Sequence, residues 1–358
     1  MLLIGGKAGE NMEFSEKNKG FFINDYSEGA HPEILKRLSE TNEQPEEGYG
    51  EDLFTKQAKE EIKRLLGKNH HSEVHLVSGG TQANLTTLGT MLKPYESVIA
   101  PATAHIAVHE TGAIEATGHK INTVPTEDGK ITPAQILDVL EEHEDEHMVL
   151  PRVIYISNTT EVGSCYTKKE LQELRTLADE QGLKIYLDGA RIGSALMTKS
   201  NDLTLEDLAE LTDAFYIGGT KNGALLGEAI VLNNRELQEN FRFAIKQRGG
   251  LMAKGRVLGL QFAALFEGDL FFQLATHANE MADILREGIH SEGYKFLVET
   301  ESNQLFPILP EPLIEELEKK YVFYRWKKID NHHTALRLVT SWATEKEKVE
   351  AFLRDLKA

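Results

Sequence analysis

The chain has a single cysteine, Cys165, among its 358 residues. One cysteine excludes an intrachain disulfide, which fits the reducing cytoplasm, and we interpret Cys165 as structural. The chain also lacks any apolar run near the roughly 18–20 residues that a membrane span needs. Its first ten residues, MLLIGGKAGE, are too short and too soon charged for a signal peptide. These absences predict a cytoplasmic protein that does not bind membranes.

Positive charge is scarce relative to negative charge. Lysine and arginine together number 39 and aspartate and glutamate 57, so the formal net charge is 39 − 57 = −18. An acidic surface repels phosphate backbones and anionic lipids. Nucleic acid is therefore not an expected partner, although a small anion could bind in a locally basic pocket.

Internal repeats and low-complexity segments are absent as well, and the chain alternates between strand and helix patterns. Helical periodicity is clearest over 168–182, where Gly182 is expected to end the helix. This alternation is typical of an α/β fold with a mostly parallel, seven-stranded sheet. The segments that predict strands are 73–77, 97–100, 120–124, 152–157, 184–190, 213–219 and 228–233.

A length of 358 residues favours two domains. We expect an N-terminal arm at residues 1–19, a large domain at 20–245 and a smaller α+β domain at 246–358. Within the smaller domain, residues 249–266 predict one long buried helix and residues 334–340 predict a short strand.

Polar signatures follow four of the predicted strands. Because the ligands of such sheets bind beyond the carboxyl ends of the strands, the four are expected to form one site. The signatures are SGGTQAN at 78–84, SNTTEVG at 157–163, LDGAR at 187–191 and GGTKNG at 218–223.

The first signature, SGGTQAN, follows a strand and opens a helix. Glycines there let backbone N–H groups and the helix dipole hold an anion. Thr81 is expected to cap the helix and to offer its hydroxyl. The segment matches neither GxxxxGK[ST] nor GxGxxG, which argues against a nicotinamide cofactor. A plain tight turn is the alternative.

Two charged residues stand at the other strand ends. Asp188 could hold a metal or a protonated ring nitrogen; the alternatives are a helix cap or an ion pair with Arg191. Lys221 is either a solvated loop lysine or a desolvated, nucleophilic amine. The glycines around Lys221 would then keep side chains away from a cofactor face. An anion cradle, an aspartate and a glycine-flanked lysine together imply pyridoxal phosphate.

Two histidines, His105 and His109, lie four residues apart, a spacing that can bind metal on a helix. No Glu follows His105 as in HExxH and no third ligand is evident, so we expect no metal. A ring that packs flat on a cofactor is a better use for one of them; a core or surface histidine is the alternative.

At these residues the chain resembles the threonine aldolases, in the fold-type I group of pyridoxal-phosphate enzymes. The resemblance covers nearly the whole chain and is closest to the branch that carries GGTKNG. It implies a homo-oligomer, a dimer or a homotetramer built from close dimers, with shared active sites. The motifs, in the family's order, are YGEDLFTK, GGTQANL, AHIAVHETGA, TTEVGS, YLDGAR, GGTKNG and SNQLF.

The resemblance also implies roles for single residues. Lys221 would form the Schiff base, Asp188 would pair with the ring nitrogen, and His105 would stack on the ring near the substrate's β-hydroxyl. Arg337, by itself an ordinary strand-end charge, would bind the substrate carboxylate as a bidentate fork. The other implied cofactor contacts are Gly80, Thr81 and Gln82 at the phosphate, Arg191, Thr220, and, reaching a neighbouring subunit's phosphate, Lys246 and Lys254. Tyr49 would lie near a subunit interface.

Two departures from the family pattern bear on the site. Asn24 precedes Asp25 where relatives often have serine; Asn24 can still bind a substrate carboxylate. Thr160 and Glu161 stand where some relatives carry a second active-site histidine. The expected base for the β-hydroxyl is therefore His105 or a water that it holds, with Glu161 second.

The expected reaction is cleavage of a β-hydroxy-α-amino acid, such as L-threonine or L-allo-threonine, to glycine and an aldehyde. A β-eliminating lyase or an aminotransferase-like protein on the same scaffold is the first alternative. A cofactor-binding protein that has lost catalysis and serves in assembly is the second.

Overall fold

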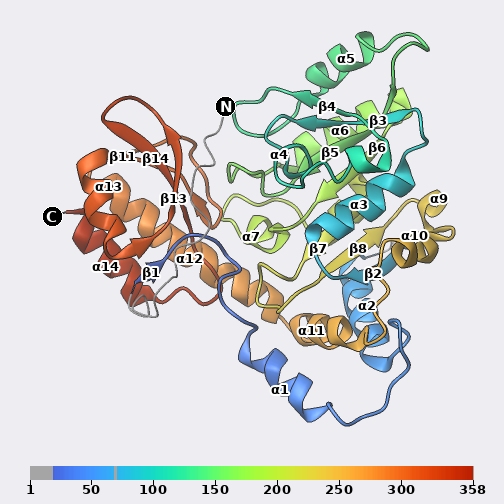
Figure 1. The fold of residues 1–358 in the computed structure, drawn as a ribbon, viewed down its shortest axis with the longest axis horizontal. Helices are drawn as coiled ribbons and strands as arrows, with labels where there is room; N and C mark the ends of the chain where they lie inside the picture. The colour runs from blue at the N-terminus through green and yellow to red at the C-terminus, as the bar shows by residue number, and fades with distance from the viewer. Residues whose placement is uncertain (1–18, 68–70, 358) are drawn as a thin grey trace.

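The computed structural model describes residues 19–67 and 71–357, and its centre is a sheet of seven strands (Figure 1). β8 runs antiparallel to both of its neighbours, and the remaining pairs are parallel. The predicted mostly parallel, seven-stranded sheet is confirmed. In spatial order the strands are β2 (Glu73–Val77), β8 (Glu228–Leu232), β7 (Ala214–Gly218), β6 (Lys184–Asp188), β5 (Leu150–Ser157), β3 (Glu96–Pro101) and β4 (Ile121–Val124).

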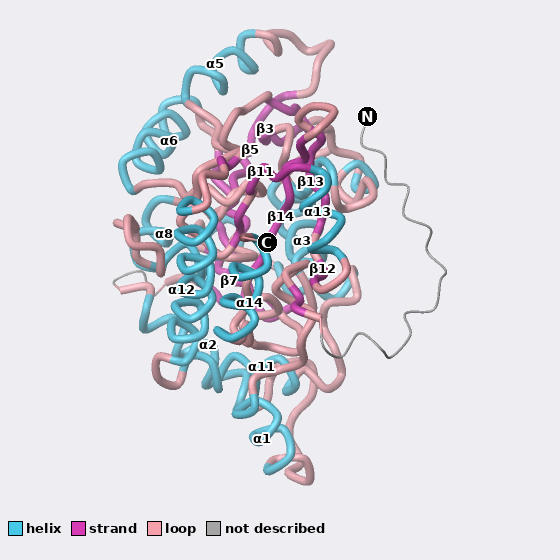
Figure 2. The backbone as a smooth tube through the Cα atoms, turned by 90° about the vertical axis from the view of Figure 1, so that its left-hand side faces the viewer, coloured by secondary structure: helices cyan, strands magenta, loops and turns pink. Residues whose placement is uncertain are grey.

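Side chains alternate between the two faces of the sheet and build two separate apolar cores. On β5, Ile154 and Ile156 enter one core, while Val153 and Tyr155 enter the other. Figure 2 shows α5, α6 and α8 on one side of the strands and α3 on the other. The first core is covered by α1 (Pro32–Glu40), α2 (Leu53–Leu65), α5 (Pro133–Glu141), α6 (Lys168–Gln181), α7 (Ile192–Leu196), α8 (Leu205–Leu211) and α11 (Arg256–Phe266); the second by α3 (Gly80–Met91), α4 (His105–Val108), α9 (Arg235–Gln238) and α10 (Phe241–Gln247).

Helix α6 shows how local sequence sets an element. Thr167 and Glu170 form a capping box, in which each side chain bonds to the other's backbone N–H. Gly182 ends the helix in the left-handed region, at φ 64°, which a residue without Cβ adopts at little cost. The predicted helix is confirmed. Its buried face is Leu171, Leu174, Leu177 and Ala178.

Two local predictions are wrong. The N-cap of α3 is Gly79, without a side-chain hydrogen bond, and Thr81 is exposed in the first turn, so Thr81 does not cap the helix. The helix predicted over 249–266 begins only at Arg256. Gly249 lies at φ +75°, which interrupts helical geometry, and the backbone that follows it forms a loop.

The C-terminal part of the described chain has a smaller antiparallel sheet around β14 (His333–Val339). β14 pairs with β10, β11 and β13, which confirms the strand predicted at 334–340. β1 (Gly20–Phe21) pairs in parallel with β12, so the start of the described chain joins this part. The other elements are β9 (Lys295–Phe296), β10 (Gln304–Leu305), β11 (Pro307–Pro310), β12 (Tyr321–Val322), β13 (Tyr324–Lys328), α12 (Leu270–Ser291), α13 (Glu311–Glu318) and α14 (Lys346–Leu356).

The predicted domain boundaries stay a prediction. The apolar clusters themselves change between Leu274, in the large core, and Met281, in a third core that also contains Phe22. Residues 1–18 of the predicted arm lie outside the described residues. No single helix in the described part of the chain is long and apolar enough to cross a membrane.

Candidate active site

The four polar signatures lie at one edge of the large sheet, because β2, β5, β6 and β7 point in the same direction. Asp188 is the last residue of β6, and Lys221 lies in the loop between β7 and β8. A hollow of about 260 Å³ opens beside that loop. Its lining includes Asp25, Arg191, Lys221 and Asn303.

Asp188 is buried at the centre of a set of neutral hydrogen-bond donors. Its Oδ1 accepts from the Tyr216 hydroxyl at 2.5 Å and the Ala190 N–H at 3.0 Å. Its Oδ2 accepts from the Tyr155 hydroxyl at 2.6 Å and the Asn84 amide at 3.1 Å. Burial raises the pKa of Asp188, but the bonds from the two tyrosines and Ala190, together with the nearby charge of His105, outweigh it and lower the pKa overall. Asp188 is therefore an ionised carboxylate that meets no cationic side chain in an ion pair among residues 19–67 and 71–357.

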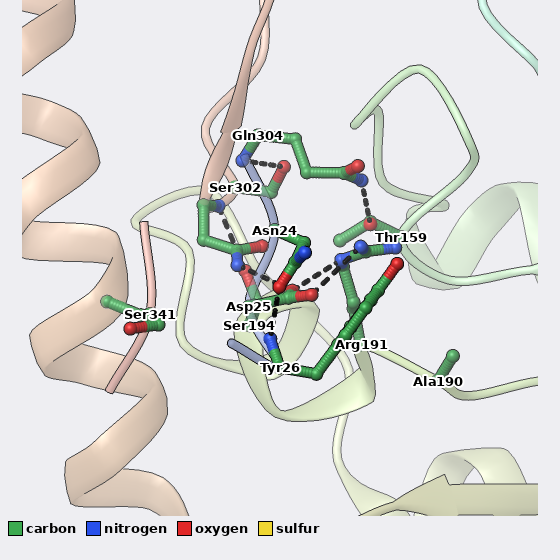
Figure 3. Close-up of polar contacts among 12 residues, drawn as sticks. Asn24, Asp25, Tyr26, Thr159, Ala190, Arg191, Ser194, Ser302, Gln304 and Ser341 are labelled. Atoms are coloured by element: carbon green, nitrogen blue, oxygen red, sulfur yellow. Dashed lines mark hydrogen bonds and ion pairs between the residues drawn. The ribbon is translucent and has the colours of Figure 1, made fainter. Parts of the chain in front are cut away.

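Arg191 pairs with Asp25 and not with Asp188, so the alternative of an Asp188–Arg191 ion pair is excluded. Arg191 donates to Asp25 from Nε at 2.6 Å and from Nη2 at 3.0 Å. The Asn303 amide donates to the same carboxylate at 3.0 Å. Figure 3 shows Arg191 reaching toward Asp25, with Asn24 beside them. The Asn24 carboxamide oxygen accepts locally, from the Tyr26 N–H at 3.0 Å.

Lys221 is only partly exposed in this loop. Burial and the nearby charge of Arg191 lower the pKa of Lys221, although the carboxylates of Asp25, Glu161 and Asp188 oppose the shift. A larger share of its amine is therefore neutral, and nucleophilic, than for a solvated lysine.

The glycines beside Lys221 serve a purpose other than the predicted one. A Cβ on Gly218 would meet the Ala190 carbonyl, and a Cβ on Gly219 would meet Phe262 at 2.9 Å. Protein atoms already fill the space that side chains would take, so these glycines permit close backbone packing.

A third buried carboxyl, Glu228, contacts the backbone of the lysine loop. Its Oε2 accepts from the Gly219 N–H at 3.1 Å. Burial raises the pKa of Glu228 to about 8, against a hydrogen bond from Thr220 and the charge of Lys221. Thr220 also accepts from the Gly227 N–H at 3.0 Å, which closes the loop around the lysine.

His105 begins α4, and its Nδ1 lies 2.8 Å from Oε1 of the buried Glu110. His109 lies with its ring 5.4 Å from that of His105 and is exposed. Among the residues that the structure describes, no group of three or more His, Cys, Asp or Glu side chains could hold a metal ion.

Arg337 lies on β14 and is held by Gln304 and Trp326. Its Nε and Nη2 donate to the Gln304 carboxamide oxygen at 3.2 and 2.7 Å. Its guanidinium lies 5.5 Å from the centre of the Trp326 ring. Gln304 donates in turn to the Thr159 hydroxyl at 3.3 Å, in the SNTTEVG segment (Figure 3). The arginine is thus tied to the edge of the large sheet.

The predicted anion cradle is the segment at 78–84 that follows β2. It is open at Gly79, where an added Cβ would meet nothing within 4 Å. At Gly80 it would meet the Tyr216 hydroxyl at 3.1 Å, so the cradle and the Asp188 set adjoin. Gln82 accepts from the Ser78 N–H at 3.1 Å and donates to the Arg248 carbonyl at 3.1 Å.

The two remaining lysines lie at the surface. Lys246 stacks on Tyr49, with its amine 4.4 Å from the ring centre. Lys254 is exposed in the loop before α11. Their contact with a neighbouring subunit stays a prediction, as do the cofactor contacts of Gly80, Thr81, Gln82, Arg191 and Thr220.

Several residues in the site were not predicted. Asn84 and Glu110 lie inside the GGTQANL and AHIAVHETGA motifs, but nothing in their spacing shows that they meet. Tyr155 and Tyr216 interrupt apolar strands with a polar tip, a signal that alternation along the strand could have exposed. The remaining unpredicted residues are Gln304, Asn303 and Glu228.

The chain is similar in sequence and in structure to known proteins. Residues 25–311 match the β-eliminating lyase family. A low specificity L-threonine aldolase of Pseudomonas aeruginosa is 34% identical, over 94% of this chain and 96% of its own. A solved threonine aldolase of Leishmania major is 48% identical with a TM-score of 0.93, over 94% of this chain and 98% of its own. A Thermus thermophilus aspartate aminotransferase variant, 14% identical with a TM-score of 0.70 over 94% of this chain and 91% of its own, shares the fold alone.

Proposed function

Because the chain belongs to the β-eliminating lyase family and, within it, to the threonine aldolases, we propose that it cleaves L-threonine and L-allo-threonine to glycine and acetaldehyde with pyridoxal phosphate as cofactor. The fold is that of the fold-type I enzymes. The observation that carries the proposal is Asp188, a buried carboxylate at a strand end whose pKa is lowered and whose direct hydrogen-bond donors among the described residues are all neutral.

The residues present fit this cofactor. Asp188 already accepts four hydrogen bonds from neutral donors but forms no direct ion pair with a described residue, and a protonated pyridine nitrogen would supply one. The open backbone at Gly79 and the N-terminus of α3 suit a phosphate. Lys221, whose pKa is lowered, would hold the cofactor through its amine. When bound, pyridoxal phosphate supplies a sink for the electron pair released from the Cα–Cβ bond.

The residues around this cluster would orient the substrate and move its protons. Gln304 takes one N–H from each of Nε and Nη2 of Arg337, which leaves Nη1 and the second N–H of Nη2 for a bidentate contact with the substrate carboxylate. His105 would take the β-hydroxyl proton, with Glu161 as the second candidate. As that proton leaves, the β-carbon becomes the aldehyde carbonyl, the Cα–Cβ bond breaks, and Cα is protonated to give glycine. Asn24 would assist at the carboxylate.

We further propose that the protein assembles as a homodimer or homotetramer in the cytoplasm. Large apolar side chains are exposed on α2 and α10, with Leu53 66% and Phe243 77% exposed. Arg242 donates to the Tyr49 carbonyl and pairs with Glu51, which links α10 to the loop that leads into α2. A second copy of the chain would cover this surface. Free Cys165, whose burial raises its pKa to about 12, fits a reducing compartment.

The test of the reaction is a product assay. Purified protein with pyridoxal phosphate is mixed with L-allo-threonine, L-threonine and β-phenylserine, and aldehyde and glycine are both measured. Equal amounts of the two are expected, and none from Lys221→Ala. No aldehyde from any of the three substrates would contradict the proposal. Ammonia and a keto acid in place of glycine would instead indicate a β-eliminating or aminotransferase-like activity.

A further inference from the structure

A chain of hydrogen bonds between buried groups joins His105 to Asp188. Glu110 Oε1 lies 2.8 Å from His105 Nδ1 and accepts from the Asn84 amide at 2.7 Å. The same Asn84 nitrogen donates to Asp188 at 3.1 Å. The Tyr186 hydroxyl donates to the Asn84 oxygen at 3.0 Å, which fixes the amide with its nitrogen toward both carboxylates.

Glu110 is buried away from solvent and forms an ion pair with His105 when that histidine is protonated. Its side chain is 0% exposed, whereas that of His105 is 30% exposed. Its Oε2 accepts no hydrogen bond from the described residues, whereas its Oε1 is aimed at both His105 and Asn84. A buried carboxyl with so few partners is costly, which implies a use for the contact that it makes.

The backbone holds Glu110 in place. Thr111, which follows it, lies at φ 53° and Gly112 at φ 71°. A β-branched residue rarely adopts a left-handed conformation and keeps it only where its surroundings impose it. The turn that aims Glu110 inward is therefore fixed by the fold.

A carboxylate at Nδ1 decides which nitrogen of a neutral imidazole carries the proton. Nδ1 becomes the donor, and the lone pair lies on Nε2. We propose that Glu110 is the positioning residue for His105: it holds the proton on Nδ1 and so makes Nε2 the base that takes the substrate's β-hydroxyl proton. The same carboxylate stabilises the imidazolium that forms. This inference rests on the proposed function, because it names the base of that reaction.

Other charges act on His105 as well. Burial lowers the pKa of His105, but the hydrogen bond to Glu110 and the charges of Glu161 and Asp188 raise it overall. Removal of the Glu110 charge should therefore lower this pKa. The titratable groups that face His105 are Glu110, Glu161, Asp188, Lys221 and His109.

The kinetic test is Glu110→Gln in the holoenzyme. An amide oxygen at the position of Oε1 can still accept from both Asn84 and His105 Nδ1, so this variant keeps the tautomer but loses the negative charge that stabilises the imidazolium. We expect kcat to fall about 10- to 100-fold, less than the roughly 10²- to 10⁴-fold contribution of a whole general base because Glu110 acts through His105, with little change in KM. The acid limb of the kcat/KM profile should move to lower pH. Glu110→Asp should recover part of the loss. The control His109→Gln removes the neighbouring imidazole and should leave the profile in place.

The structural test does not need turnover. Histidine is labelled with ¹⁵N, and the His105 signals are assigned by their loss in His105→Asn. The neutral imidazole of the wild-type protein should show a protonated Nδ1 and an unprotonated Nε2, and Glu110→Leu, which removes the acceptor, should lose this preference. A wild-type His105 protonated on Nε2 alone would overturn the proposal, even if the variant does not fold, and so would a Glu110→Gln enzyme with unchanged kcat and pH profile. Absence of aldehyde from the wild type would refute the aldolase function instead, and the tautomer measurement would still decide the role of Glu110.

Discussion

Two buried aspartates in the site keep their charge by different means. Asp25 is clamped by two hydrogen bonds from Arg191, so its counter-charge is built into the chain. Asp188 is held by two tyrosine hydroxyls, an amide and a backbone N–H, all neutral. The pKa is lowered at both, against the effect of burial.

The difference separates a structural carboxylate from a chemical one. The charge of Asp25 is already compensated, so its effect is to fix Arg191 at the edge of the site. Asp188 is in direct contact with neutral donors alone among the described residues, and the charge of His105 acts on it without a direct hydrogen bond, so a bound cation could still pair with it. Asp188 is therefore the better partner for a cofactor's protonated ring nitrogen.

The largest expected effect is a loss of kcat on removal of the Asp188 charge. Asp188→Asn keeps the side-chain shape but cannot hold a ring nitrogen protonated. We expect kcat for aldehyde release to fall about 10³-fold, equivalent to about 4 kcal/mol. The assay is run with saturating cofactor, and circular dichroism establishes that the variant is folded. A variant with more than a tenth of wild-type kcat would show that the two aspartates do not differ as argued.

Removal of the Asp25 charge should reduce the stability of the protein. Asp25→Asn leaves Arg191 buried without its anion, and we expect the free energy of unfolding to fall by about 3 kcal/mol. Urea unfolding measures it. The double variant Asp25→Asn/Arg191→Gln should recover part of that loss, because no unpaired charge remains. Equal losses in the single and double variants would mean that the ion pair is not the cause.

A smaller loss of activity is expected on removal of one neutral hydrogen-bond donor to Asp188. Tyr216→Phe removes one hydrogen bond to Asp188, and we expect the pKa of Asp188 to rise and kcat to fall about tenfold, since one such bond to a charged group contributes about 1.5 kcal/mol. The matched control is Tyr186→Phe, an equally buried hydroxyl that donates to Asn84 instead. If both variants lose the same fraction of kcat, the direct hydrogen bond from Tyr216 to Asp188 is not the cause of the loss.

The last prediction concerns stability rather than turnover. It rests on a third buried carboxyl, Glu228, whose pKa is raised to about 8. A carboxyl with a raised folded-state pKa stabilises the protein fully only below its unfolded pKa, and that contribution is lost as pH rises toward the folded value. The unfolding free energy of the wild-type apoprotein should therefore decline from about pH 5 to 8. Glu228→Gln, which cannot ionise, should decline less. Parallel pH profiles for the two proteins would contradict this.

The sequence predicts the sheet and its edge well. Each strand of the large sheet carries a short apolar run, and four polar signatures follow strands that prove to point the same way. The predicted helix over 249–266 is wrong in its first part because Gly249 takes a left-handed φ that periodicity does not register. Thr81 fails as a cap for a similar reason: backbone geometry moves the cap to Gly79.

The site is predicted only in part. Asp188 and Lys221 stand out because each places a charge directly after an apolar strand, where burial is costly unless the charge is used. The partners of Asp188 do not stand out, since Tyr155 and Asn84 are distant in sequence and meet only through strand register and the position of α3. Glu110 follows His105 by five residues, and its use depends on a turn that only the folded chain reveals.

The most direct measurement is the protonation state of the cofactor's ring nitrogen. The protein is reconstituted with pyridoxal phosphate labelled with ¹⁵N in the ring, and the ¹⁵N chemical shift is recorded for the wild type, Asp25→Asn and Asp188→Asn. We predict a protonated nitrogen in the wild type and in Asp25→Asn, and an unprotonated one in Asp188→Asn. A wild-type nitrogen that is unprotonated, or one that stays protonated in Asp188→Asn, would contradict the role given to Asp188.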